Sequence, residues 1–274
     1  MQNDLKIVFV GGGNMAQALI GGIAEKLIPA ANIHVVDVVP QTLASLASRF
    51  GVTTAAAPSD TLASADVIVL AVKPQQMREV VTSLQPFVNH QLVLSIAAGI
   101  RAIDLSRWLG GHQAIVRTMP NTPALVGKGI TGAVAMAGVS AAQRDVADAI
   151  LRAVGETVWI DDEAQIDAVT AISGSGPAYV FYFIEAMQQA AVELGLTEQQ
   201  GRRLAQATFA GAAELAAHSD EPVSLLRERV TSKGGTTYAA LAAMEASDMK
   251  AAFVNALHAA AARGKALGEE FGKD

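Results

Sequence analysis

Three glycines directly after the first apolar segment are spaced to bind a phosphate group. Residues 5–10 lead straight into Gly11-Gly12-Gly13-Asn14-Met15-Ala16, and a helical pattern follows. In the G-x-G-x-x-[GA] fingerprint that this segment fits, the first glycine makes the tight turn, the second lets the backbone approach a pyrophosphate, and the small third residue lets the helix pack closely on the strand. The helix N-terminus adds amide groups and positive potential. The predicted dinucleotide contacts are Gly11, Gly13, Asn14 and Met15. The alternative is a glycine turn that only joins a strand to a helix.

A carboxylate at the end of the second apolar segment bears on which dinucleotide binds. Asp37 closes residues 33–37, where a carboxylate can hydrogen-bond the ribose 2′-hydroxyl of NAD and repel the 2′-phosphate of NADP. No arginine follows it directly, so the chemistry at this position favours NADH. The alternative is a turn residue before Pro40, which leaves Gln41 and Thr42 to accept a phosphate. NADPH and NADH both remain candidates.

Two more loops are predicted to complete the dinucleotide site. They are Ala71-Val72-Lys73-Pro74 and Ala97-Ala98-Gly99, each at the carboxyl end of an apolar segment. Open parallel sheets bind ligands at that edge, and small residues there let a nicotinamide and its ribose lie against the backbone. Lys73 either faces the ribose or phosphates or is an ordinary solvated lysine.

A parallel sheet is needed to bring these loops together, and the first 160 or so residues predict one. Short, almost wholly apolar segments alternate with helical patterns, as expected for strands covered by helices on both faces. The predicted strands are residues 5–10, 33–37, 67–72, 92–96 and 114–118, with 157–160 as an edge strand. Ser140 and Gln143 form a capping box that starts a helix ending before Gly155.

After Asp161 the strand signals stop and only helical patterns remain. They cover residues 177–194, 197–218, 222–230, 236–246 and 248–268, punctuated by Pro177 in a first turn, Gly195 at a C-terminal end and Thr197 as an N-cap. The prediction is an α/β Rossmann domain with a mostly parallel sheet over residues 1–162, followed by an all-α domain over 163–274. Its apolar, alanine-rich helices predict self-association.

The composition excludes several classes of function. The 274 residues carry a net charge of −6 without a basic or acidic block, so neither nucleic acid nor an anionic membrane is an expected partner. There is no cysteine, and the five histidines show no ligand spacing, so no metal is expected. No apolar run reaches the roughly 18 to 20 residues that span a bilayer. The residues after Met1 do not form a basic stretch followed by a cleavable apolar segment, which predicts a cytoplasmic protein.

Three polar, glycine-rich segments go beyond what packing requires. They are residues 117–123, 173–179 and 230–237, the last reading Val-Thr-Ser-Lys-Gly-Gly-Thr-Thr. With these segments the whole chain resembles the pyrroline-5-carboxylate reductases, and residues 230–245 resemble the signature region of that family. The resemblance implies a Rossmann domain, a helical dimerisation domain whose partner completes each active site, and NAD(P)H-dependent reduction of 1-pyrroline-5-carboxylate to L-proline.

The resemblance also implies the roles of particular residues. Thr237 corresponds to the hydroxyl beside the pyrroline nitrogen, and the turn from Ser232 to Thr237, with Gly234, Gly235 and Thr236, corresponds to the seat of the substrate carboxylate. Glu163 and Asp220 fall near further substrate positions. Asp37-Val38 stands where many members have Asn-Arg. At that position the chain departs from the pattern of the NADPH-binding members.

The residues of this turn suit the chemistry that the resemblance implies. Gly234-Gly235 before a helix start forms a nest of amides that can hold a carboxylate without an arginine. A protonated cyclic imine is already electrophilic, so a hydroxyl that orients it or relays a proton is enough. The alternatives are a flexible glycine pair at a helix cap and a Thr237 hydroxyl that only caps the helix.

Two rival functions remain at this point. A β-hydroxyacid dehydrogenase would need a base on the helix after Gly174-Ser175-Gly176, where that family has lysine and this chain has Val180. A third alternative is an NAD(P)-dependent reductase that acts on a different imine. A non-catalytic dinucleotide-binding protein would need the glycine fingerprint but not the three polar segments.

Overall fold

The computed structural model describes residues 4–273 of the chain. It divides into two compact units, one made of Met1–Ser175 together with Ala260–Asp274 and the other of Gly176–Ala259. The first unit therefore contains the sheet and the end of the last helix. The sequence-based boundary between residues 162 and 163 remains a prediction about domains, and the compact units divide thirteen residues later, at Ser175.

The first unit is built on one sheet of eight strands. Their spatial order is β3-β2-β1-β4-β5-β6-β7-β8, and all neighbours are parallel except β6 and β7. The order 3-2-1-4-5-6 of the first six strands is that of doubly wound dinucleotide-binding sheets, so the predicted Rossmann fold is confirmed. The strands are β1 (Ile7–Val10), β2 (Ile33–Val36), β3 (Thr53–Ala55), β4 (Val67–Leu70), β5 (Leu92–Ser95), β6 (Ile115–Met119), β7 (Gly129–Ala135) and β8 (Gly155–Trp159).

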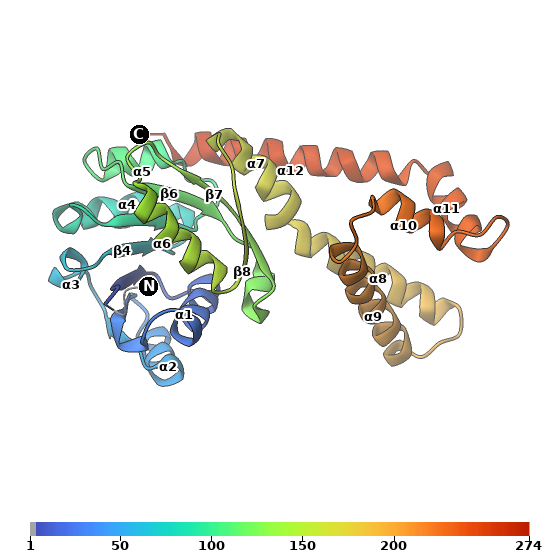
Figure 1. Ribbon diagram of the computed structural model, residues 1–274, viewed down its shortest axis with the longest axis horizontal. Helices are drawn as coiled ribbons and strands as arrows, with labels where there is room; N and C mark the ends of the chain where they lie inside the picture. The colour runs from blue at the N-terminus through green and yellow to red at the C-terminus, as the bar shows by residue number, and fades with distance from the viewer. Residues whose placement is uncertain (1–3, 274) are drawn as a thin grey trace. The chain divides into compact units, whose positions relative to one another are not determined.

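Both faces of the sheet are buried under helices (Figure 1). Successive strand residues point to opposite faces. Ile7 and Phe9 pack with α1 (Asn14–Lys26), α2 (Pro40–Phe50) and α6 (Ala141–Arg152). Val8 and Val10 pack on the other face with α3 (Asp60–Ala63), α4 (Pro74–Leu84) and α5 (Ala102–Trp108). The apolar strands seen in the sequence follow from this double cover.

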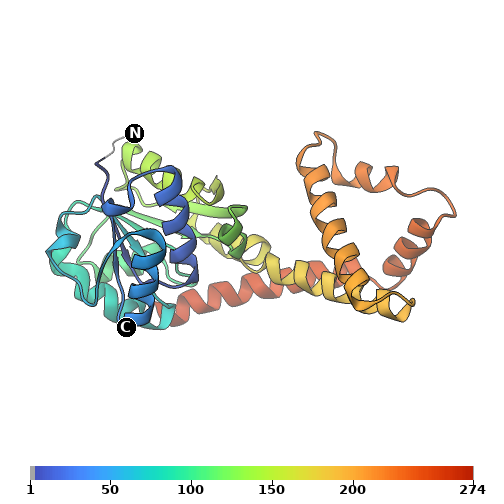
Figure 2. The ribbon, with the colours of Figure 1, turned by 90° about the horizontal axis from the view of Figure 1, so that it is seen from below.

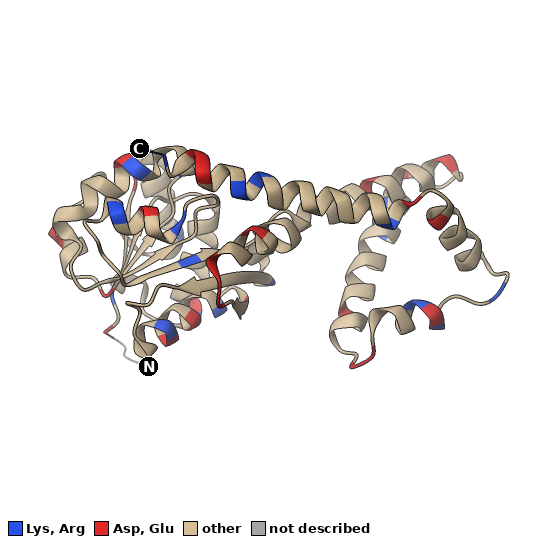
Figure 3. Ribbon diagram, turned by 90° about the horizontal axis from the view of Figure 1, so that it is seen from above, with Lys and Arg blue, Asp and Glu red and all other residues tan. Residues whose placement is uncertain are grey.

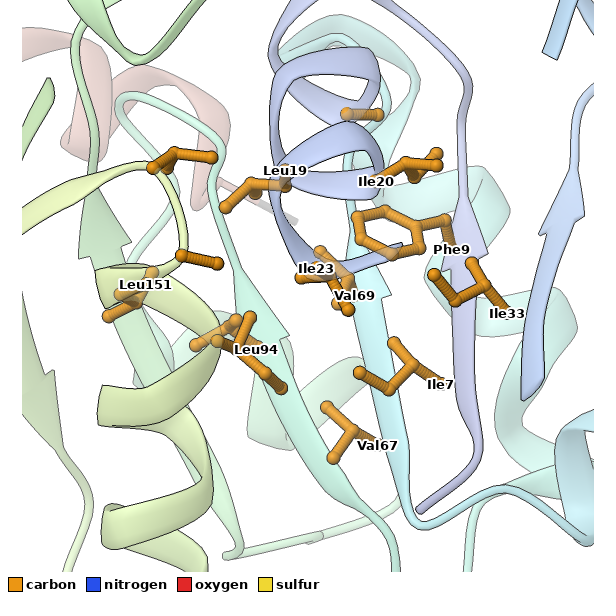
Figure 4. Packing of buried hydrophobic residues seen from close by; sticks show 14 of the residues in the cluster. Ile7, Phe9, Leu19, Ile20, Ile23, Ile33, Val67, Val69, Leu94 and Leu151 are labelled. Carbon is orange, nitrogen blue, oxygen red and sulfur yellow. The ribbon is translucent and has the colours of Figure 1, made fainter. Parts of the chain in front are cut away.

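The core between β1 and α1 is fully closed. Ile7, Phe9, Leu19, Ile20 and Ile23 are all 0 % exposed, and Figure 4 shows their side chains filling the space between strand and helix. Figure 2 shows α1 and α2 lying over the strands on the side that faces the viewer. This packing fixes where α1 begins, and with it the place of the glycine-rich loop.

Two strands of the sheet were not predicted from the sequence. β3 has only three residues, and β7 contains two glycines and two alanines, which weaken the β-branched signal of a strand. β8 confirms the predicted edge strand and pairs with β7 in parallel. The predicted capping box is confirmed, because the Ser140 side chain accepts from the Gln143 amide and α6 ends at Arg152.

The remaining short helical turns connect these elements. They are η1 (Ala30–Asn32), η2 (Gln85–Phe87), η3 (Thr122–Val126), η4 (Glu163–Gln165), α7 (Ile166–Val169) and the π-helical turn η5 (Thr170–Gly174).

The second unit is wholly helical, as predicted. It contains α8 (Gly176–Glu193), α9 (Glu198–Ala217), α10 (Val223–Arg229), α11 (Thr236–Ala246) and the first half of α12 (Met249–Phe271). Pro177 lies in the first turn of α8, Gly195 has φ +92° after it, and Thr197 caps α9 in a second capping box. Large apolar side chains stay exposed in this unit, among them Phe181, Tyr182, Leu194 and Leu215 at 64–84 %.

The last turns of α12 belong to the first unit. Gly264 and Gly268 are buried there, and Phe271 packs against the core around α4 and α5. Arg107 of α5 donates to the Gly272 carbonyl at 2.8 Å, which satisfies one of the free carbonyls at the helix end.

Charged residues of both signs are spread along the chain. Figure 3 shows Lys and Arg interspersed with Asp and Glu along the ribbon. Within residues 4–273, no helix combines the length and the apolar character needed to cross a membrane.

Candidate functional site

The carboxyl ends of β2, β1, β4 and β5 lie side by side, because these four strands are adjacent and parallel. The predicted loops after them therefore meet at one edge of the sheet. Between β1 and β4 the strand order reverses direction, and this switch point is where open α/β sheets leave a crevice for a ligand.

Gly11 holds the loop after β1 against the loop after β4. Its φ is +101°, and a Cβ built on it would lie 2.6 Å from the Ala71 carbonyl oxygen. The Gly11 amide also donates to the Val36 carbonyl at 2.8 Å. The position thus needs glycine for both conformation and space. Gly11 and Ala71 bring the loops after β1 and β4 into direct contact.

Gly13 opens onto free space instead. It is exposed, and a Cβ built on it would have no heavy atom within 4 Å. It is also the N-cap of α1, and no side chain caps that helix end. The first amides of α1 are therefore free to bind an anion, while Ala16 is buried beneath them at 1 % exposure. This arrangement fits the pyrophosphate of a dinucleotide.

Asp37 lies directly beside the glycine-rich loop. Its Oδ2 accepts from the Gly12 amide at 2.7 Å, and its Oδ1 accepts from the Val39 amide at 2.8 Å. The hydrogen bond from Gly12 joins the end of β2 to the loop that would hold the phosphates. The hydrogen bond from Val39 is the turn contact that the sequence analysis gave as the alternative role of Asp37. A carboxylate in this place faces where the ribose of a dinucleotide lies in this fold.

The other two loops differ in how accessible they are. Lys73 is exposed and Pro74 starts α4 directly after it. Ala97 and Gly99 are buried, and a Cβ on Gly99 would lie 3.1 Å from the Leu267 Cβ of α12. Gly99 is thus held from behind by the last turns of α12, and Ala98 is only partly buried.

The turn before α11 has the predicted form. Gly234 has φ +73°, the Gly235 amide donates to the Ser232 carbonyl at 3.0 Å, and Gly235 is the N-cap of α11. Thr237 is consequently the second residue of the helix and not its cap. Among residues 4–273 its hydroxyl has no hydrogen-bond partner, which leaves it free for a ligand.

Glu163 and Asp220 lie in different surroundings from this turn. Glu163 belongs to the first unit, where its Oε1 accepts from the Ala102 amide at 2.7 Å and from Arg117 at 2.8 Å. Asp220 is exposed in the bend between α9 and α10. No hydrogen bond or ion pair within the described part of the chain joins Asp220 to residues 232–237.

The sequence did not single out two residues that organise the site. Gly12 supplies the amide for Asp37, and a Cβ there would meet the Thr42 and Leu46 side chains at 2.7 Å. Asn121 accepts from the Ile130 amide and donates to the Ser173 carbonyl of η5, so it ties the polar segments 117–123 and 173–179 together. Their polar composition was the only signal of this contact.

Comparison with known proteins covers almost the entire chain. Residues 163–267 match the family profile described as pyrroline-5-carboxylate reductase dimerisation, and residues 6–99 match the profile described as NADP oxidoreductase coenzyme F420-dependent. A pyrroline-5-carboxylate reductase of Pseudomonas aeruginosa is 46 % identical over 98 % of both chains. This chain belongs to the pyrroline-5-carboxylate reductase family. It self-associates through the helical part that matches the dimerisation profile.

Solved structures of the same family have the same fold. The pyrroline-5-carboxylate reductase of Coxiella burnetii has a TM-score of 0.90 at 39 % identity, covering 96 % of this chain and 98 % of its own. The pyrroline carboxylate reductase of Plasmodium falciparum, solved with NADP bound, has a TM-score of 0.88 at 31 % identity, covering 98 % and 100 %. In contrast, a 3-hydroxyisobutyrate dehydrogenase of Mycobacterium tuberculosis is 16 % identical, which shows the fold alone.

Proposed function

We propose that this chain reduces 1-pyrroline-5-carboxylate to L-proline with NADH or NADPH. The observation that carries the proposal is the 46 % identity to a pyrroline-5-carboxylate reductase over 98 % of the chain, which includes both the glycine-rich loop and the turn before α11. The reaction closes a proline-forming sequence and consumes one proton and one reduced dinucleotide.

The first unit holds the dinucleotide. The uncapped amides at the start of α1, beside the free space at Gly13, would bind the pyrophosphate, and Asp37 at the end of β2 would hydrogen-bond the ribose. The loop at 71–74 and the partly buried Ala98 of the loop at 97–99 would lie against the nicotinamide half. When bound, the reduced nicotinamide supplies the hydride that adds to the imine carbon.

The turn before α11 holds the substrate. The amides of Gly234 and Thr236 form the seat for its carboxylate at the positive end of α11, and Gly235 between them is held by its hydrogen bond to the Ser232 carbonyl. Thr237 lies one residue further into the helix, with a free hydroxyl that can hydrogen-bond the pyrroline nitrogen. Ser232 shapes the turn through its carbonyl, and Glu163 and Asp220 are proposed at its margin.

Little proton chemistry is required of the protein. The imine nitrogen must carry a proton when hydride arrives, and a hydroxyl that orients or relays this proton suffices. Most of the rate then comes from holding the imine carbon against the nicotinamide. Since self-association occurs through the helical part, we place the turn of one chain against the dinucleotide edge of its partner.

Asp37 makes NADH the preferred reductant. Each of its two carboxylate oxygens accepts a hydrogen bond from a backbone amide, so the position and orientation of the carboxylate are fixed. A 2′-phosphate would meet this charge with no arginine following at Val38 to offset it. The cytoplasmic location expected from the sequence is part of the same proposal.

The test is oxidation of the dinucleotide, measured by its loss of absorbance with and without 1-pyrroline-5-carboxylate. Consumption that depends on the pyrroline, with L-proline recovered in equal amount, is the expected result. Binding of NADH without any pyrroline-dependent oxidation would instead support a dinucleotide-binding protein without catalysis.

A further inference from the structure

The loop after β5 has few hydrogen bonds of its own. The Ala97 amide donates to the Ser95 hydroxyl oxygen at 3.4 Å. Among residues 4–273, no hydrogen bond joins residues 98–100 to the rest of the chain. A segment with so few hydrogen bonds keeps its conformation through the side chains that pack against it. The position of this loop therefore depends on its packing partners.

The last turns of α12 are the packing partners of this loop. A Cβ built on Gly99 would lie 3.1 Å from the Leu267 Cβ and 3.3 Å from the Phe271 Cδ2, so the helix comes this close because position 99 has no side chain. Gly268 is buried on the same part of α12, and a Cβ built on it would lie 3.6 Å from the Arg101 Cγ. Leu267 and Phe271 thus form the back wall of the loop.

A buried carboxylate ties the end of α12 to the residue that follows the loop. The Asp104 side chain is 3 % exposed, and its oxygens lie 2.6 Å from the Arg101 Nε and 3.3 Å from the Arg107 Nη2. Arg107 in turn donates to the Gly272 carbonyl at 2.8 Å. Because Arg101 directly follows the loop, the loop and the end of α12 share one charged anchor.

We propose that Leu267 and Phe271 are positioning residues, which set the place of the Ala98 and Gly99 backbone against the nicotinamide of a bound dinucleotide. This inference rests on the proposed dinucleotide site at the carboxyl edge of the sheet. Ala98 is only partly buried, whereas Gly99 is covered by α12. The helix acts through the loop and does not touch the dinucleotide. A shift of about 1 Å at such a contact can lower a rate about a hundredfold.

The alternative is that Phe271 only completes the core around α4 and α5. Phe87 is a matched control for this alternative, because it is a partly buried phenylalanine packed against the same core cluster. It lies in η2, before β5, whereas Gly99 follows the other end of that strand. Truncation of either phenylalanine should lower the melting temperature, but only Phe271 lies against Gly99.

The experiment is calorimetric titration of the full-length protein with two pairs of probes. The pairs are NADH with ADP-ribose, and NADPH with 2′-phospho-ADP-ribose, and the members of each pair differ by the reduced nicotinamide ring. The fluorescence emission of the bound reduced dinucleotide is a second readout, because it comes from that ring. The variants are Phe271→Ala, Phe271→Leu, Phe87→Ala and Arg107→Gln, each with its melting temperature.

Phe271→Ala should weaken binding of the reduced dinucleotide about fivefold or more and change binding of the matching ADP-ribose by less than about twofold. Phe271→Leu keeps an apolar side chain over Gly99 and should restore most of the affinity. Phe87→Ala should lower the melting temperature and leave all four affinities unchanged. Arg107→Gln releases the Gly272 carbonyl without opening the core, and it should weaken the reduced dinucleotide about threefold. This variant decides the question if Phe271→Ala does not fold.

The proposal is overturned if Phe271→Ala weakens both members of a pair alike, or if it changes neither the affinity nor the emission. It is equally overturned if Phe87→Ala gives the same selective loss. If the unaltered protein bound the reduced dinucleotide no more tightly than ADP-ribose and without a change in emission, the ring would not meet the loop and the proposal would fail. None of these measurements needs turnover. Binding of the dinucleotide without pyrroline-dependent oxidation would contradict the proposed function and leave this test intact.

Discussion

Asp37 serves two purposes, and its substitution separates them. Its carboxylate accepts from the Gly12 amide of the glycine-rich loop and, in the proposed site, presents negative charge to the ribose. Asp37→Ser should raise the ratio of kcat/KM with NADPH to kcat/KM with NADH by about tenfold, because the repulsion of the 2′-phosphate is removed. Activity with NADH should fall, since Gly12 loses its acceptor. An NADPH preference already present in the unaltered enzyme would refute the assignment.

Thr237 offers a sharper test, because the structure shows that its hydroxyl does not cap a helix. Gly235 caps α11, so Thr237→Ala deletes no capping hydrogen bond. We expect kcat/KM to fall about a hundredfold while the melting temperature and the NADH dissociation constant stay nearly the same. Thr237→Ser keeps the oxygen and should restore most of the activity. An Ala variant that is active would end the catalytic assignment.

Asp167 should make folding stability depend on pH. Burial raises its pKa above the ordinary 3.8, so the folded state holds this proton more tightly than the unfolded state. Its contribution to stability is therefore greatest below the ordinary pKa and is lost as pH rises through the raised pKa. Asp167→Asn should be the more stable protein at neutral pH, and the gain should shrink on acidification. Urea unfolding of both proteins between about pH 4 and pH 7 measures this. Equal stability at every pH would contradict it.

How far the sequence predicts individual residues depends on how local their partners are. The conformation of Gly11 and the free space at Gly13 follow from a six-residue motif. The environment of Glu163 does not, because its partners Ala102 and Arg117 lie 61 and 46 residues away. No local pattern indicates such a contact.

At the scale of elements, the loop between β1 and α1 allows a matched comparison of two glycines. Gly11→Ala would place a Cβ 2.6 Å from the Ala71 carbonyl in a left-handed conformation. It should cost about 2 kcal/mol or more of unfolding free energy.

Gly13→Ala meets nothing within 4 Å and should cost less than about 1 kcal/mol. It should nevertheless weaken NADH binding about tenfold, because the methyl group occupies the approach of the pyrophosphate. Thermal unfolding and fluorescence titration of both variants measure the two effects. If both variants lost the same unfolding free energy, the space beside Gly13 would not be open for a ligand to occupy.

The bounds of a helix were predictable from the sequence where its amphipathic pattern and its capping residues indicate the same ends. The helices from α8 to α12 begin and end within a few residues of their predicted bounds, because Pro177, Gly195 and Thr197 mark them. β7 was missed because its position inside the sheet comes from pairing with β6 and β8 and not from its own glycine-containing sequence. The π-helical turn η5 likewise has no pattern of its own.

At the scale of the whole molecule, the proposed sharing of each active site between two chains predicts complementation. Thr237→Ala and Gly13→Leu should each be nearly inactive alone. Mixed by joint refolding, they form hybrids in which the intact turn of one chain meets the intact dinucleotide site of the other. Random pairing should restore about a quarter of the wild-type activity. If each chain built its own complete site, the mixture would stay inactive.

The division of the first unit between two stretches of chain has a consequence for protein synthesis. Residues 176–259 must be made after the sheet and before the turns of α12 that cover Gly99. At about 5 to 20 residues per second, these 84 residues take about 4 to 17 s. During that interval the nascent sheet is complete, but the surface around Gly99 that Leu267 and Phe271 cover stays open. Ribosome-bound chains stalled before residue 260 should therefore recruit chaperones more strongly than chains stalled after the whole sequence has emerged.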